Sequence, residues 1–384
     1  MDINFHYFAV KVIAVMAGYN NTEADEIAAF SQYADDYFDS APFRTTEPPP
    51  FQTPIYNTGD LKVYPVQTGI QTLYSISENH QRNVIVPFHF IPPRQLSIAG
   101  VRYRTTPAQW ADWDNQLITQ MIRTLLNSRP SHPYFRVFLG LLLHVFADTY
   151  AHQSFNGFHQ KHINDGRVMK ANVTYLDGSR HEKSYSSYSA LPAIGHADLG
   201  TAPDETALTY TCMRDNGSGQ MTEQPERVNA YVFLQCAHQI LKILCAAKGV
   251  SEPGEHEVAI LDAALGNGFL VDCSSSIDEL CRHWQTNVPS INGTAISYGY
   301  NAQAIHTELF EVNAEKLPEN ITLEQVHTLL NTVTEKTEQE DELNAQQAAF
   351  SKLAELSALG AVKPTAGYYY FNTCAYEIRK LVNS

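Results

Sequence analysis

Apolar residues dominate long stretches of the chain, and their spacing predicts helices rather than strands. Residues 3–17 are apolar on most sides, which predicts a buried helix. Thr22 followed by Asp25 gives a capping signal for a second helix that runs to about residue 38. The stretch 133–155 is hydrophobic on nearly every face, so we expect it to form the central helix of the core.

The remaining chain contains further helical patterns and one constrained segment. We expect a third helix over 106–128, starting near Pro107. Residues 83–93, NVIVPFHFIPP, are rich in proline and predict a short extended or irregular piece. Helices resume at 225–247, and the polar stretch 322–359 predicts one or two exposed helices.

The pattern changes between residues 165 and 225, where Gly, Ser, Tyr and Asp are frequent and periodicity is weak. We therefore expect a loop-rich insertion, with possible short strands near 171–179 and 180–189. The chain length allows one large domain or two. We divide it into a helical core, 1–250, which contains the insertion, and a C-terminal helical extension, 251–384.

Composition indicates a folded globular protein and excludes one class of partner. Hydrophobic residues make up 44% of the chain and charged residues 17%. The net charge of −15 provides no general attraction for phosphate backbones, so we do not expect duplex nucleic acid to bind. The six cysteines form no C-x-x-C pair, and free thiols in a reducing compartment are the favoured interpretation.

The N-terminal residues, MDINFHYFAVKVIAVMAGYN, lack the positive region of a signal peptide. Uninterrupted apolar runs are also shorter than a bilayer requires, so we expect no transmembrane segment. These features favour a cytoplasmic location, or export without a cleavable signal peptide. The oligomeric state is left open by the sequence.

Candidate chemistry lies on the central helix, where His144, Asp148 and His152 follow one another at four-residue intervals. A helix turns about 100° per residue, so these side chains share a face, and Leu141 marks that face as inward. The Cα atoms of His144 and His152 should lie roughly 12 Å apart, which is long for two ligands of one ion. The spacing suits two ions about 3.5–4 Å apart with Asp148 bridging them.

Two interpretations of this stripe are possible, a metal site or a satisfied buried hydrogen-bond network. Other polar residues at apolar positions favour the metal site. Asp35 falls within the apolar arc of the second helix, whereas Asp36 points outward and should be solvated. A carboxylate on an apolar face is costly unless it is paired or ligated, so Asp35 is a candidate ligand or general base.

Further candidates come from three other segments. His6 lies in line with the apolar residues of the first helix, and His89 sits in the constrained segment PFHF. The turn-rich stretch GHADLGTAPD contributes His196, Asp198 and Asp204. Five histidines stand in polar surroundings and are expected at the surface: His80, His132, His181, His256 and His327.

The order of these residues resembles the zinc-dependent phospholipase C and single-strand-specific zinc nuclease group. That resemblance covers roughly residues 1–205 and implies a mainly α protein, a multi-helical bundle of the phospholipase C type. It also implies a zinc centre that hydrolyses phosphodiester or phosphomonoester bonds. Further histidines follow the central helix in that group, so His159 and His162 are added as candidates.

Two departures from that group bear on the number of ions. The group uses the free amine of an N-terminal Trp, whereas this chain starts with Met1 and shows no signal for cleavage. It also carries an H-x3-E motif that is missing here, and His196 with Asp198 or Asp204 is the candidate replacement. Two ions are therefore the safer expectation over three; Mn and Fe accept the same ligands as Zn.

The sequence resembles an uncharacterised bacterial family more strongly still. That family has M-x-I-D-F-H at its start, QYVDD, PFHF and LHxxADTxAHQ, followed by a GH…PD segment. The corresponding pieces here are MDINFH, QYADD, PFHF, LLHVFADTYAHQ and GHADLGTAPD. The family has no assigned function, so this similarity adds no chemistry.

The expected function is a metal-dependent phosphoesterase. Its site would contain Asp35 and Asp148 as catalytic residues, and its substrate would be a small phosphate ester, a phospholipid or a nucleotide. One alternative is an HD-like nucleotide phosphohydrolase, although the chain contains no His-Asp dipeptide. The other is a non-enzymatic helical interaction protein in which the His/Asp network only holds the core.

Overall fold

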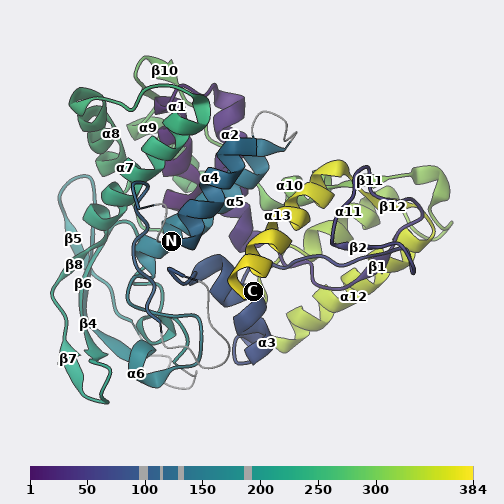
Figure 1. The fold of residues 1–384 in the computed structure, drawn as a ribbon, viewed down its shortest axis with the longest axis horizontal. Helices are drawn as coiled ribbons and strands as arrows, with labels where there is room; N and C mark the ends of the chain where they lie inside the picture. The colour runs from purple at the N-terminus through teal and green to yellow at the C-terminus, as the bar shows by residue number, and fades with distance from the viewer. Residues whose placement is uncertain (95–102, 113–115, 129–133, 186–192, 384) are drawn as a thin grey trace.

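The computed structural model describes residues 1–94, 103–112, 116–128, 134–185 and 193–383. It is mostly helical, with 51% of residues in helices and 13 α-helices among the described residues. Figure 1 shows a larger lobe on the left and a narrower lobe on the right, with α13 (Ala366–Asn383) beside their junction.

The centre of the larger lobe is α5 (Phe135–Ala151), in which every residue from Val137 to Ala151 is buried. A helix without a polar face must be covered on all sides. Neighbouring helices from distant parts of the chain, including α13, pack against it. Besides α13, the helices around α5 are α2 (Asn21–Asp36), α4 (Leu117–Ser128), α7 (Asn229–Lys248) and the π-helix η3 (Gln81–His89).

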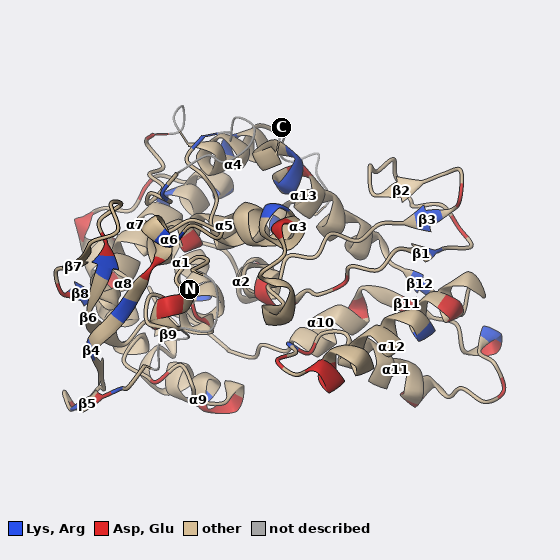
Figure 2. Cartoon of the chain, turned by 90° about the horizontal axis from the view of Figure 1, so that it is seen from below, with Lys and Arg blue, Asp and Glu red and all other residues tan. Residues whose placement is uncertain are grey.

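The N-terminal segment runs beside this central helix. It starts as a π-helix, η1 (Asn4–Ala9), and continues as α1 (Val10–Met16); both are almost completely buried. Figure 2 shows the N-terminus inside the larger lobe, next to α1. On the outer side, α8 (Glu255–Gly268) and α9 (Ile277–Asn287) cover η1 and α1, and Trp284 stacks on Phe8 with ring centroids 5.5 Å apart.

Five strands between residues 166 and 228 form an antiparallel sheet that is more extensive than the sequence indicated. The strand order is β5-β4-β6-β7, and β8 also pairs with β6. Along β6, buried and partly exposed residues alternate over LTYTCM, which is the period of a strand with one buried face. The strands are β4 (Gly166–Thr174), β5 (Arg180–Glu182), β6 (Leu208–Asp215), β7 (Met221–Glu223) and β8 (Arg227–Val228).

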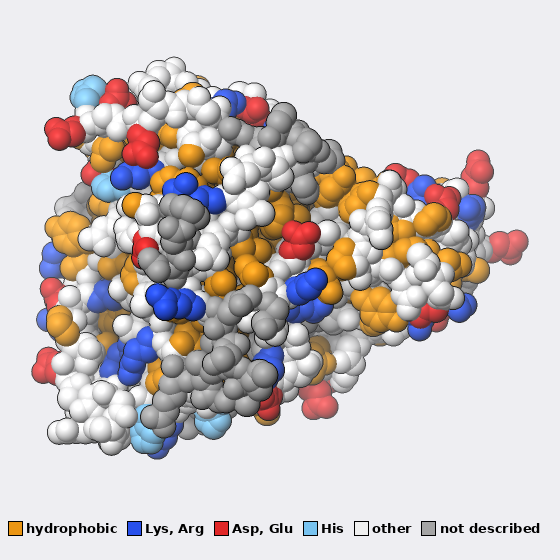
Figure 3. Space-filling view, in the orientation of Figure 1, with side chains coloured by type: hydrophobic (Ala, Val, Ile, Leu, Met, Phe, Trp, Pro, Cys, Tyr) orange, Lys and Arg blue, Asp and Glu red, His pale blue; other side chains and the backbone are white. Residues whose placement is uncertain are grey.

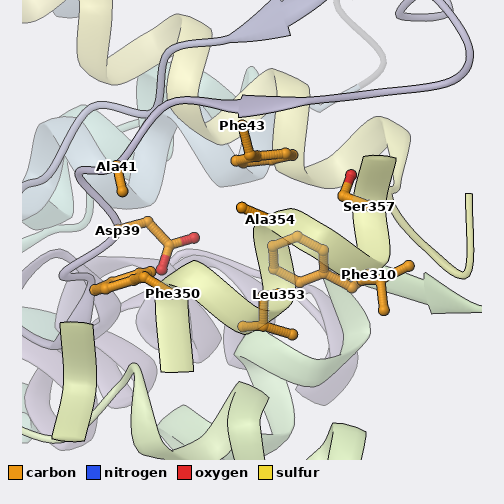
Figure 4. A pocket seen from close by; sticks show the side chains of 9 residues that line it. Asp39, Ala41, Phe43, Phe310, Phe350, Leu353, Ala354 and Ser357 are labelled. Atoms are coloured by element: carbon orange, nitrogen blue, oxygen red, sulfur yellow. The ribbon is translucent and has the colours of Figure 1, made fainter. Parts of the chain in front are cut away.

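The smaller lobe has its own apolar cluster, formed mainly by α11 (Leu323–Thr332) and α12 (Glu340–Ala358). Short antiparallel strands lie against these helices: β1 (Phe43–Arg44), β2 (Tyr56–Asn57), β3 (Lys62–Val63), β11 (Phe310–Val312) and β12 (Val362–Pro364). A cavity of about 20 Å³ lies between β1, β11 and α12, and Phe43, Phe310 and Phe350 are among the residues that line it (Figure 4). That volume holds about one water molecule.

The other described elements connect these parts. The helical ones are α3 (Glu78–His80), α6 (Lys161–Asn164), α10 (Ala302–Glu308) and the 3-10 turns η2 (Thr72–Tyr74), η4 (Ala197–Leu199) and η5 (Ala314–Lys316). The last two strands, β9 (Ser290–Ile291) and β10 (Thr294–Ala295), form a hairpin.

Three sequence predictions of local structure are wrong. The capping box of α2 is formed by Asn20 and Glu23 instead of Thr22 and Asp25, with Glu23 N donating to Asn20 Oδ1 at 3.0 Å. The segment around His89 is helical and not extended, because a wide π-type turn accommodates Pro87, as the i→i−5 bond from Phe90 N to Ile85 O shows.

The third error concerns the start of α4, which begins at Leu117 and not near Pro107. The preceding backbone amides are bonded to side chains, so they do not form a helical ladder. Ala108 N donates to Thr149 Oγ1 at 2.9 Å, and Trp110 N donates to Gln239 Oε1 at 3.0 Å.

By length and composition, α7 is apolar enough to cross a membrane, and half of its most apolar window is buried inside the protein. Its inner side packs on α1 and α5 as part of the main core. A buried core helix of a soluble protein has the same composition.

Gly140 fixes how closely α2 and α5 approach each other. A Cβ atom at this position would lie 2.5 Å from Ile27 O and 3.0 Å from Phe30 Cβ. We expect Gly140→Ala to lower the free energy of unfolding in urea by about 1–3 kcal/mol, because the helices must separate.

Gly266→Ala on α8 is the matched control, because no atom lies within 4 Å of the added Cβ. This variant should be neutral or more stable by up to about 1 kcal/mol. Equal effects of the two substitutions on urea unfolding would contradict the close helix contact.

Candidate metal centre

Residues from five segments meet at the inner end of α5. His144 and Asp148 project from α5 itself, and His152 follows its last residue. The other side chains of the site belong to η1, to the end of α2, to the end of η3 and to the loop between β5 and β6. The residues brought together are His6, Asp35, His89, His144, Asp148, His152, His196 and Asp204.

Asp148 is the shared centre of this arrangement, and its side chain is only 1% exposed. Its Oδ1 lies 3.1 Å from His6 Nε2. Its Oδ2 lies 3.2 Å from His89 Nδ1 and 3.4 Å from His144 Nε2. A single carboxylate surrounded by several imidazoles is the arrangement expected of a ligand that bridges two cations.

Asp35, His89 and His144 form one possible ligand group, and Asp148 contacts both of its imidazoles. His89 Nδ1 and His144 Nε2 are 3.4 Å apart, and they lie 3.7 and 3.8 Å from Asp35 Oδ1. With the contacts to Asp148 Oδ2, five of the six distances among these atoms fall between 3.2 and 3.8 Å. Ligand atoms about 2.0–2.1 Å from a tetrahedral zinc ion are separated by about 3.3–3.4 Å. The contacts among His89, His144 and Asp148 have this spacing, and those of Asp35 are a few tenths of an ångström longer.

A second group lies at the other end of the cluster. Asp204 Oδ1 is 3.0 Å from His152 Nε2, and Asp204 Oδ2 is 3.2 Å from His196 Nε2. The three side chains offer ligand atoms within 4.8 Å of one another. Asp204, rather than Asp198, is therefore the carboxylate that accompanies His196.

The amino group of Met1 was not among our predicted site residues, yet it lies between the two groups. It is 2.5 Å from Asp148 Oδ1 and 3.3 Å from Asp204 Oδ1. Together with His6 and His144, Asp148 forms a third possible ligand group beside it. In the sequence, the one feature that could have identified this amino group is that Met1 lies five residues before the candidate ligand His6.

Backbone carbonyl groups orient three of the imidazoles. Thr68 O lies 2.8 Å from His89 Nε2, Gly200 O lies 2.8 Å from His196 Nδ1, and His89 O accepts from His152 Nδ1. His152 Nδ1 also lies 3.6 Å from Asp148 Oδ2. At His89 and His196 the contact places the proton on the nitrogen that faces away from the carboxylates. The unprotonated nitrogen then points inward, which is the arrangement of histidines that bind metals.

Electrostatics keep Asp148 charged and leave the imidazoles of His6, His144 and His196 neutral. At His89 burial is outweighed by the hydrogen bond to Asp148 and the charge of Asp35, so its pKa is raised. Burial opposes the charge of Asp148, but His152, the Met1 amino group and His144 hold its pKa well below the usual range. Burial lowers the pKa of His6 and of His196 to about 4. These protonation states are the ones that bind a cation.

Asp35 differs from Asp148 because its side chain is 31% exposed. Burial of its carboxyl group, opposed by His89 and reinforced by Asp148, raises the pKa of Asp35 to about 7. The side chains of His196 and Asp204 are also partly exposed, at 15% and 18%. The cluster therefore faces solvent along the side formed by Asp35, His196 and Asp204.

Three of the candidate residues lie outside the cluster. Asp198 lies beside Asp165. Burial, together with the carboxyl group of Asp165, raises the pKa of Asp198. His159 is exposed, and its backbone N donates to Gln81 Oε1. His162 is half exposed, with Nδ1 3.0 Å from Asp215 Oδ2.

Two other predictions about polar residues are wrong. Asp36 is half-buried instead of solvated, because it accepts hydrogen bonds from Tyr300 OH at 2.5 Å and from Gln32 Nε2 at 3.2 Å. His80 is buried by its position between Ser77 and η3, and burial lowers its pKa to about 4. His181, His256 and His327 are exposed as expected, and His132 lies outside the described residues.

Fold and site together define a mainly helical protein with buried His/Asp groups that could hold metal ions. The chain belongs to DUF6765, a family of unknown function whose profile matches residues 1–381. No curated protein and no solved structure shows a significant match. The comparisons provide no link to phospholipase C or to zinc nucleases.

Metal affinity should depend on pH through Asp35. The carboxyl group has a pKa of about 7 in the metal-free protein, so it is protonated below pH 7 and must release this proton to bind a cation. We expect the affinity for Zn²⁺ to fall as the pH drops from about 7.5 to 5.5, and isothermal titration calorimetry in buffers of different ionisation enthalpy should detect proton release.

Asp35→Asn removes this proton, so the pH dependence in that interval should become weaker. His162→Asn is the control, since the half-exposed His162 pairs with Asp215 outside the cluster. Proton release that is the same in wild type and Asp35→Asn would contradict the assignment to Asp35.

Proposed function

We propose that the protein is a metal-dependent phosphoesterase that holds two or three divalent ions, with zinc as the favoured metal. The observation that carries the proposal is the set of distances among Asp35, His89, His144 and Asp148. Most of them exceed the 2.7–3.2 Å of ordinary hydrogen bonds and match the spacing of ligands around one ion.

The unsatisfied nitrogens of the cluster argue against a purely structural network. His6 Nδ1 and His144 Nδ1 are buried, and neither has a hydrogen-bond partner in the described part of the chain. A network selected only to stabilise the core would be expected to satisfy them, because each unpaired buried group costs about 1–3 kcal/mol. The cluster nevertheless gathers seven other possible ligand residues around Asp148, which favours a functional site.

When bound, divalent cations at these groups would polarise a phosphate oxygen and lower the pKa of water. The carboxylate Oδ1 of Asp35 faces both the ligand group and solvent, so it can orient a water molecule or accept its proton. A pKa of about 7 suits a group that gains and loses a proton near neutral pH.

The partly exposed side of the cluster indicates where a substrate would approach. Asp35 lies at one end of this side, and His196 with Asp204 lies at the other. Met1, His6 and His144 form the closed, fully buried side. We propose that a small phosphate ester, either a nucleotide or a phospholipid head group, binds across the open side with its phosphate between the two ends.

The test compares Asp148→Asn with Asp36→Asn, using metal analysis and hydrolysis of bis(p-nitrophenyl) phosphate and p-nitrophenyl phosphate. We expect purified wild type to contain at least one transition-metal ion per chain and to lose activity with EDTA. Asp148→Asn should lose metal and at least about a hundredfold in activity, because even residues behind the ligands contribute 10–100-fold.

Asp36→Asn is the matched control. Asp36 is adjacent to Asp35 but bonds to Tyr300 and Gln32, and an Asn side chain can keep both contacts. Its metal content and activity should stay close to wild type. A wild-type protein that is folded, contains less than one metal ion per chain and gains none on reconstitution would overturn the proposal and favour the structural role.

A further inference from the structure

A groove on the larger lobe contains uncompensated arginines, although the chain as a whole is strongly acidic. The groove has a volume of about 480 Å³ and lies between the turn after α5, strand β6 and the start of α7. We call it the arginine groove; its walls include Gln153, Phe155, Tyr210, Arg214, Arg227 and Tyr231. On the face drawn in Figure 3, Lys and Arg side chains lie mainly over this lobe.

Arg214 is the most informative residue of the groove because it is only 8% exposed. Its Nη2 donates to Ser154 O at 3.0 Å and to Ile163 O at 2.7 Å. Its Nε is buried without a hydrogen-bond partner, and no described residue accepts a bond from Nη1. A guanidinium group has five N–H donors, and because Nε is shielded from solvent, Nη1 is the part of the group left for a ligand.

Neither arginine of the groove is neutralised by a carboxylate within the described residues. Arg227 donates to Asn229 Oδ1 and to the carbonyl oxygens of Tyr150 and Pro203, all of which are uncharged. Glu226 also lines the groove, but it forms no ion pair with either arginine. A buried positive charge without a partner is costly, which indicates that an anion supplies the missing charge.

The other residues that line the groove indicate the chemistry of the rest of the ligand. The guanidinium carbon of Arg214 lies 3.7 Å from the centre of the Phe155 ring, which fixes the plane of the charged group. Tyr231 is 69% exposed at the mouth, and Tyr210 and Val228 provide apolar surface inside. Small-molecule sites combine such apolar walls with a few polar groups.

We propose that the arginine groove binds a small organic oxyanion, with a carboxylate, phosphate or phosphonate group at Arg214 and an apolar body against Tyr231. This site is separate from the metal centre and does not depend on the proposed phosphoesterase activity. Phe155 lies between them, with its ring centroid 5.9 Å from that of His196. Arg227 also bonds to Pro203, the neighbour of Asp204, at 3.4 Å.

The test measures binding of phenylphosphonate to the full-length protein as purified, by calorimetry. The C–P bond resists hydrolysis, so the probe reports binding only. We expect a Kd in the range of about 0.1–1 mM, weaker binding of inorganic phosphate, and no loss of binding when EDTA is added.

Tyr231→Glu places a negative charge at the mouth of the groove and should weaken binding about tenfold, whereas the neutral control Tyr231→Gln should have a much smaller effect. Glu226→Gln should strengthen binding, because it removes a repulsive charge. Both positions are exposed, so these variants should fold normally. Arg214→Gln should abolish binding, provided that circular dichroism shows a native fold.

Three results would overturn the proposal. The first is no detectable binding at roughly 10 mM probe, since a site with weaker affinity than this provides little recognition. The second is equal affinity in wild type, Tyr231→Glu and Tyr231→Gln. The third is binding that disappears with EDTA, which would place the anion at the metal centre and support the proposed function instead.

Discussion

The larger lobe is organised around one buried carboxylate. Asp148 lies on a helix that is otherwise apolar, and the cost of burying its charge is offset by the groups that surround it. Those groups come from distant segments, with His6 142 residues and His89 59 residues from Asp148 along the chain. The same contacts therefore also hold η1 and η3 against α5. Removing this charge therefore affects both the packing and the chemistry of the protein.

Much of the site could be predicted because helix periodicity is a local property. The four-residue spacing of His144, Asp148 and His152 determines a shared face regardless of tertiary structure. The apolar arc of α2 similarly distinguishes Asp35, which faces the site, from Asp36. It does not reveal that Asp36 accepts a hydrogen bond from Tyr300, which lies far along the chain. Side-chain partners from distant segments leave no periodic signal.

The fold was less predictable where the backbone bonds to side chains or departs from regular geometry. The residues before α4 looked helical, but distant side-chain acceptors such as Gln239 Oε1 bind their amides. The strands of residues 166–228 are short, and their polar composition concealed the alternation in β6. The amino group of Met1 was missed because backbone termini do not appear in a side-chain motif.

Two of the histidines in the cluster lie on π-helices, His6 on η1 and His89 on η3. Such helices have wider turns than α-helices and weaker packing along their axes, so they occur mainly where function maintains them. A π-helix differs from an α-helix by roughly one additional residue in a turn. Deleting a residue here would relax the helix and rotate the imidazole by about 100°. A regular α-helix would be the more stable backbone for these segments. It would also turn His6 or His89 away from Asp148, so the position of the histidine requires the π-helix.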